Sequence, residues 1–157
     1  MKIKAQFGQG KLALITGGSS GIGFALAENL VRQGNDVILV ARRKELLDQR
    51  VKELRSLVQS PSQIVESIPI DVANWDDVLA MARQYLDKGM VPDVIINSAG
   101  VVEPGYVQEL EVERFHWMMD INYHGTVHVI KAFLPEMMKR KCGYIINISS
   151  GGGLAGL

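Results

Sequence analysis

Short apolar runs alternate with amphipathic stretches along this 157-residue chain, and this alternation constrains its fold most strongly. Runs too short for helices predict strands at residues 12–16, 37–41, 64–71, 94–97 and 145–148. Between them, helical spacing of apolar residues predicts helices over 21–33, 44–59, a segment after Asn74, and 112–139. Strands without polar alternation are buried on both faces, which indicates a parallel sheet covered by helices on each side. We expect one α/β domain over residues 1–157, with a doubly wound sheet that is truncated after the fifth strand.

Individual residue types refine the helix predictions. Gly34 can end the first helix, and Asn74 can cap the third. The long fourth helix is expected to bend near Gly125 and Pro135. The apolar face of the first helix is predicted to consist of Ile22, Ala25, Leu26 and Leu30.

Composition excludes several classes of protein. Apolar residues make up 47% and charged residues 22% of the chain, the balance of a globular domain in water. Basic and acidic residues number 17 each, so no net field favours nucleic acid, and no apolar run is long enough for a transmembrane segment. The N-terminus carries no apolar stretch of signal-peptide length. The single cysteine, Cys142, suits a reducing compartment, and we expect a cytoplasmic location.

A glycine-rich turn, Thr-Gly-Gly-Ser-Ser-Gly-Ile-Gly, follows the first strand and opens a helix. Gly17 suits a tight turn, Gly21 would let a cofactor pyrophosphate approach the backbone, and Gly23 would let the helix pack on the strand. Ser19 and Ser20 add hydroxyls that can bond phosphate or ribose. No lysine follows the glycines, which argues against a P-loop. The alternative is a Gly/Ser-rich turn that binds no ligand.

The second strand ends in arginines where many dinucleotide folds place an acid. Arg42 and Arg43 follow the strand, and no carboxylate occurs before Glu45. An acid at this place binds the ribose hydroxyls of NAD, whereas a guanidinium suits the 2′-phosphate of NADP. Arg42 is the better candidate and Arg43 the second. The alternative is that these charges only solvate a helix start, although cations there oppose the helix dipole.

With these residues assembled, the chain resembles the short-chain dehydrogenase/reductase family from Leu12 to Ser150. The family has a Rossmann fold. The resemblance assigns cofactor contacts to the glycine turn, to an acidic pair that holds the adenine ring, and to an Asn-Asn-Ala-Gly motif beside the cofactor. This chain departs from that last motif at Ser98. The implied cofactor-binding residues are Gly17, Ser19, Ser20, Gly21, Ile22, Gly23, Arg42, Arg43, Asp71, Val72, Asn97, Ala99 and Gly100.

The resemblance also implies a reaction, in which NADP(H) and a carbonyl carbon exchange hydride. A tyrosine serves as general acid, and a neighbouring lysine lowers its pKa and holds the nicotinamide ribose. Asn122 would anchor a water relay, and Ser150 would bond the substrate oxygen. Ser149 takes that place if the strand register differs by one residue.

The Tyr-x-x-x-Lys pair of the family, about a dozen residues beyond the serine, is not present in the sequence. Tyr123 is followed four residues later by Val127, and Tyr144 by Ile148. We therefore expect these 157 residues to bind NADPH weakly at most and to reduce no carbonyl. An unpaired outer edge of the fifth strand would favour association, and the complete form is expected to be a homo-oligomer.

Several segments resemble 3-ketosphinganine reductases in particular: 17–23, 40–42, 110–115, 121–125 and the Gly-Leu-rich ending at 151–157. This resemblance implies a small-molecule carbonyl substrate that is lipid-like, and peripheral membrane association if it is a lipid. Two alternatives stay open: a non-catalytic dinucleotide-binding module or truncated paralogue, and a relative acting on nucleotide sugars. His124 and His128 have the spacing of two zinc ligands, but no third ligand is evident, so no metal site is predicted.

Overall fold

The computed structural model describes residues 8–151. Its strands are β1 (Leu12–Thr16), β2 (Asp36–Ala41), β3 (Val65–Pro69), β4 (Val94–Asn97) and β5 (Tyr144–Asn147). Its helices are α1 (Gly21–Arg32), α2 (Lys44–Arg55), α3 (Trp75–Leu86), α4 (Val112–Met119), the π-helical turn η1 (Asp120–His124) and α5 (Gly125–Arg140).

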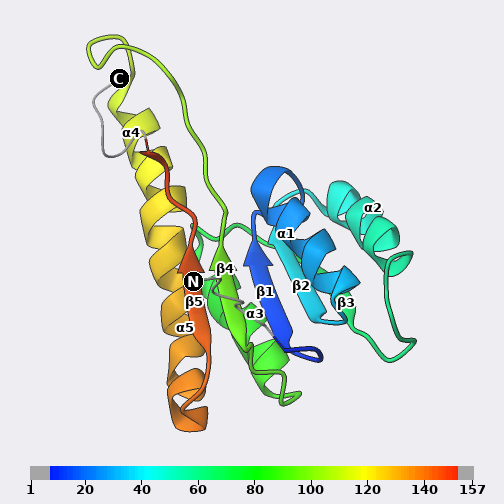
Figure 1. Ribbon diagram of the computed structural model, residues 1–157. Helices are drawn as coiled ribbons and strands as arrows, with labels where there is room; N and C mark the ends of the chain where they lie inside the picture. The colour runs from blue at the N-terminus through cyan, green and yellow to red at the C-terminus, as the bar shows by residue number, and fades with distance from the viewer. Residues whose placement is uncertain (1–7, 152–157) are drawn as a thin grey trace, which may run out of the picture.

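The five strands form one parallel sheet in the order β3-β2-β1-β4-β5. The chain runs outward from β1 to β3 and then returns to the other side of β1 for β4 and β5, which confirms the predicted doubly wound fold. Helices cover both faces of the sheet (Figure 1). The direction of strand order reverses between β1 and β4, the place where such folds bind ligands.

Alternate residues of the inner strands supply two separate cores. One face of β1, including Ala13 and Ile15, packs with residues of α1 and α2 such as Ala27 and Leu47. The other face of the sheet packs with residues of α3 and α5 such as Phe133. Side chains of β1 and β4 are buried throughout, as their uninterrupted apolar runs predict.

The helix α1 presents a different face to the sheet from the one predicted. Its buried residues are Gly23, Ala27 and Val31, whereas Ile22 is 60% exposed. A Cβ on Gly23 would lie 2.6 Å from the Gly17 carbonyl oxygen, so the helix rotates to place this glycine against the turn. Of the predicted face, Leu26 and Leu30 pack only partly against the core.

Two elements are shorter than predicted. Helix α2 ends at Arg55 rather than at residue 59. Directly after Arg55, the Ser56 hydroxyl donates to the Glu53 carbonyl. Strand β3 ends at Pro69, which the sheet tolerates because β3 is an edge strand. The predicted cap of α3 is confirmed: Asn74 Oδ1 accepts two amides of the first turn, at 3.0 and 3.3 Å.

The predicted long helix consists of three parts. The π-helical turn η1 separates α4 from α5 and ends directly before Gly125, close to one predicted bend, while Pro135 lies inside α5. A Cβ on Gly125 would lie 2.6 Å from Val72 Cγ2, so this glycine allows close packing at the carboxyl end of the sheet. The sequence did not indicate the π-helical turn.

Strand β5 differs from the other strands in its burial. It pairs with β4 on one side, yet all four of its residues are exposed in the described structure. Its side chains include Ile145 and Ile146, which are 37% and 45% exposed. The expectation of a strand buried on both faces is therefore wrong for β5.

Candidate functional site

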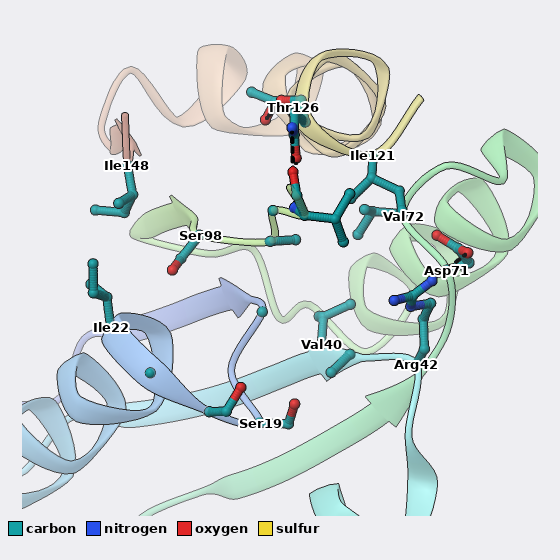
Figure 2. Close-up of a pocket in the computed structure, with 18 of the residues that line it drawn as sticks. Ser19, Ile22, Val40, Arg42, Asp71, Val72, Ser98, Ile121, Thr126 and Ile148 are labelled. Atoms are coloured by element: carbon teal, nitrogen blue, oxygen red, sulfur yellow. Dashed lines mark hydrogen bonds and ion pairs between the residues drawn. The ribbon is translucent and has the colours of Figure 1, made fainter. Parts of the chain in front are cut away.

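A cleft of about 990 Å³ lies at the carboxyl edge of the sheet, where the strand order reverses between β1 and β4. Its walls come from the turn before α1, the ends of β2 and β3, the loop after β4, and the region around η1. In Figure 2, Arg42 and Asp71 lie together at one side of the cleft, and Ile22 and Ile148 lie at the opposite side. The cleft thus runs along the ends of several strands, and an extended ligand can lie in it.

The glycine turn has the geometry that its sequence predicts. Gly17 has a φ of +66°, and a Cβ there would lie 2.6 Å from the Ser98 carbonyl oxygen. Gly21 has a φ of +55°, and a Cβ there would meet nothing within 4 Å. Gly17 therefore serves internal packing, whereas Gly21 faces open space that a ligand can enter. The backbone at Gly21 is therefore accessible from the cleft, which a ligand of the turn requires.

Thr16 joins the two halves of the site, and the sequence reasoning missed it. Its buried hydroxyl accepts hydrogen bonds from the Ser98 and Ala99 amides, both at 3.1 Å. These bonds hold the loop after β4 against the glycine turn. The signal available in the sequence was a hydroxyl residue at the last position of a buried strand, directly before the first glycine.

Asn97 is buried below the cleft and does not line it. Its Nδ2 donates to Asn147 Oδ1 at 2.9 Å, which couples the ends of β4 and β5. The Asn97 Oδ1 atom is buried and has no hydrogen-bond partner among the described residues.

The end of β2 brings positive charge into the cleft. Arg42 Nη1 lies 3.9 Å from Asp71 Oδ2, and both side chains are more than a third exposed. The other Asp71 oxygen accepts the Ala73 amide at 3.0 Å, so the carboxylate is fixed in place. A pair this long and this exposed is weak, and the guanidinium can turn toward an anionic ligand at small cost.

Asn122 lies in the π-helical turn and ties it to the loop after β4. Its side-chain amide bonds the backbone of Val101 twice: Oδ1 accepts the amide and Nδ2 donates to the carbonyl, each at 2.8 Å. The Thr126 hydroxyl donates to the Asn122 carbonyl at 3.1 Å. The side chain of Asn122 is therefore occupied in holding the cleft wall.

The structure brings nearly all of the predicted site residues together. Gly23 and Asn97 do not line the cleft: Gly23 packs against Gly17, and Asn97 bonds Asn147. The other predicted positions line the cleft. The lining positions are Gly17, Ser19, Ser20, Gly21, Ile22, Arg42, Arg43, Asp71, Val72, Ala99, Gly100, Asn122, Ser149 and Ser150.

The two histidines with zinc-ligand spacing are each engaged by a single acceptor. His124 Nδ1 lies 3.0 Å from Asp120 Oδ1, and His128 Nδ1 lies 2.9 Å from the Val72 carbonyl oxygen. Across residues 8–151, no three His, Cys, Asp or Glu side chains are grouped as metal ligands. The same part of the chain contains no helix with the length and hydrophobicity to cross a bilayer.

Comparison with known proteins assigns the chain to a family. The short chain dehydrogenase model matches residues 11–157. The 3-dehydrosphinganine reductase of Danio rerio is 36% identical over 149 residues, which cover 94% of this chain and 45% of that protein. The NADPH-dependent pterin aldehyde reductase of Arabidopsis thaliana is 38% identical over 147 residues, or 93% of this chain and 59% of that protein.

A solved structure agrees with this assignment. L-sorbose reductase from Gluconobacter frateurii, complexed with NADPH and L-sorbose, superposes with a TM-score of 0.87 at 28% identity. That alignment covers 95% of this chain and 56% of the reductase. The chain belongs to the short-chain dehydrogenase family, and it spans about half the length of the relatives it matches.

Proposed function

We propose that this chain forms the cofactor-binding part of an NADPH-dependent oxidoreductase that reduces a carbonyl to an alcohol. The observation that carries the proposal is the shared cleft of the glycine turn and the two arginines at the end of β2. Backbone amides at a glycine turn bind a pyrophosphate, and arginine binds a phosphate in bidentate fashion. The cleft thus offers sites for both anionic parts of NADPH.

The residues of the cleft fit such a cofactor. Open space in front of Gly21 allows close approach of a ligand to the backbone. No acidic residue occupies the first turn of α1, so nothing there repels an anion. Ser19 and Ser20 would bond phosphate or ribose, Arg42 and Arg43 the 2′-phosphate.

The adenine and nicotinamide ends of the cofactor would contact different walls of the cleft. Asp71 and Val72 would hold the adenine, and Ala99 and Gly100 would lie along the chain of the cofactor. Relatives named for NADPH use, among them the Arabidopsis pterin aldehyde reductase, support the choice of NADP(H).

Asn122 and Ser150 would serve the reaction itself. When bound, NADPH supplies the hydride. Ser150 would donate a hydrogen bond to the carbonyl oxygen of the substrate, which stabilises the charge that develops there. Asn122 would anchor a water of the proton relay, because its side-chain oxygen keeps a second lone pair beside the bond from Val101. None of the four tyrosines is followed by a lysine four residues later, so we propose that these 157 residues do not reduce a carbonyl by themselves.

A long-chain ketone such as 3-ketosphinganine is the substrate that we favour. The 3-dehydrosphinganine reductase of Danio rerio is 36% identical to this chain. Val102 lines the cleft and is 79% exposed, and Met118 lies in the same wall, so an apolar substrate would find apolar partners there. The exposed apolar residues Val112, Met119 and Tyr123 on α4 and η1 suit a further interface in a homo-oligomer.

A non-catalytic dinucleotide-binding module is the second candidate. The glycine turn and the two arginines of the cleft would serve such a module equally well. Activity separates the two candidates. The full-length protein should oxidise NADPH in the presence of 3-ketosphinganine or another member of a ketone panel. NADPH binding without turnover on any carbonyl would support the module instead.

Cofactor choice has its own test, the substitution Arg42→Asp. The preference for NADPH over NADH should fall by at least tenfold, because a carboxylate repels the 2′-phosphate and accepts the ribose hydroxyls. Binding constants for both cofactors on the full-length protein measure this preference. An unchanged preference would show that the end of β2 does not select the cofactor.

A further inference from the structure

The guanidinium of Arg50 contacts the glycine turn from behind, outside the cleft. Arg50 lies on α2, and its Nε donates to the carbonyl oxygen of Ser19 at 3.1 Å. Ser19 is the middle residue of the turn and is only 5% exposed.

Two more contacts fix the Arg50 side chain in this position. Its guanidinium carbon lies 4.5 Å from the centre of the Phe24 ring, which belongs to the first turn of α1. Its Nη1 donates to Glu53 Oε2 at 2.6 Å. The hydrogen bond from Arg50 is the largest cause that holds the pKa of Glu53 below its usual range, so the pair stays charged at neutral pH.

The direction of the Ser19 carbonyl determines the direction of the next amide. A peptide unit is planar and trans, so its C=O and N–H point to opposite sides. The Arg50 bond draws the Ser19 carbonyl toward α2, and the Ser20 N–H then points away from α2. Ser20 lines the cleft, whereas Arg50 does not.

We propose that Arg50 is a positioning residue for the anion-binding amides of the glycine turn. It acts through the Ser19 carbonyl and does not touch the ligand. The proposal rests on the proposed function, since it takes the ligand of the turn to be the pyrophosphate of a dinucleotide. It differs from the role of Arg42, because the pyrophosphate is common to NADPH and NADH whereas the 2′-phosphate is not.

The test compares four variants of the full-length protein: R50M, R50K, E53Q and R42A. R50M keeps an apolar stem over Phe24 but removes the donor. It should raise the dissociation constants of NADPH and NADH together, each by about tenfold, as expected for loss of one hydrogen bond from a charged donor. In steady-state assays, KM for the cofactor should rise while kcat stays within about twofold. R50K can still donate to the carbonyl and should recover part of the affinity.

The other two variants are controls with different expectations. E53Q removes the ion pair but leaves the Arg50 bond to Ser19 and its contact with Phe24, and it should bind both cofactors within about twofold of the unmodified protein. R42A should weaken NADPH alone. Unchanged cofactor binding by R50M, loss of NADPH affinity only, absence of rescue by R50K, or an equal loss in E53Q would each overturn the positioning role. If the unmodified protein binds neither cofactor, the proposed function itself fails.

Discussion

At the scale of single residues, the Thr16 hydroxyl has the most consequential contacts in the site. It stands at the end of β1 and receives two amides from the loop after β4. These are the two strand ends between which the strand order reverses. One buried oxygen atom therefore ties the loop after β4 to the end of β1, directly before the glycine turn.

Replacing Thr16 by valine should test this role. Valine has the same shape but accepts no hydrogen bond, so two partly buried amides lose their partner, at a cost of about 1–3 kcal/mol in the free energy of unfolding. Chemical denaturation measures the loss. Thr16→Ser keeps the hydroxyl and should cost less than half as much, and a serine variant as unstable as the valine variant would argue against the hydrogen bonds.

The backbone conformation of the glycine turn could be predicted, because few residues other than glycine adopt a positive φ. The positive φ of Gly17 and Gly21 follows from their place between a strand and a helix. The contacts of Thr16 and Arg50 could not be predicted. Each joins segments that are more than 30 residues apart in the sequence, and only the folded sheet brings them together.

At the scale of elements, the junction of η1 and α5 is the least regular feature of the structure. Gly125 begins α5 in close contact with Val72, directly after the π-helical turn that carries Asn122. The turn and the glycine together let the helix approach the end of β3. Helical periodicity predicts a helical segment over residues 112–139. A π-helical turn adds one residue to a single turn, and this change in the spacing of apolar residues is too small to recognise in a sequence.

Gly125→Ala should destabilise the protein although alanine is the better helix former. The added Cβ would lie 2.6 Å from Val72 Cγ2, and overpacking of this kind costs about 1–3 kcal/mol against a gain of about 1 kcal/mol in helix propensity. Thermal and urea unfolding report the net loss. Adding Val72→Ala should remove the clash, so the double variant should be more stable than the sum of the two single changes. Strict additivity would contradict the contact.

At the scale of the whole molecule, β5 leaves one side of the sheet exposed. Tyr144, Ile145 and Ile146 are all more than a third exposed, beside a shallow apolar pocket that includes Met138. Exposed apolar strands at a sheet edge pair readily with other chains. The parallel, doubly wound sheet with helices on both faces follows from the sequence, whereas the exposure of β5 does not, because an apolar run predicts burial.

A polypeptide of these 157 residues should therefore self-associate. Sedimentation at increasing concentration should show species larger than the 17.3 kDa monomer. Ile146→Lys places a charge on the exposed strand and should shift the distribution toward monomer. Val102→Lys, at an exposed position in the loop after β4, serves as the matched control and should leave the association unchanged. A monomeric unmodified chain at all concentrations would contradict this reading of β5.

Hydrogen exchange of the full-length protein, with and without NADPH, tests the central claim most directly. Bound NADPH should protect the backbone of residues 17–22 and of the loop 98–100, because both segments border the cleft between β1 and β4. The segment that contains Arg42 and Arg43 should be protected more by NADPH than by NADH at equal saturation. Protection confined to other parts of the chain, or none at saturating NADPH, would show that this cleft is not the cofactor site.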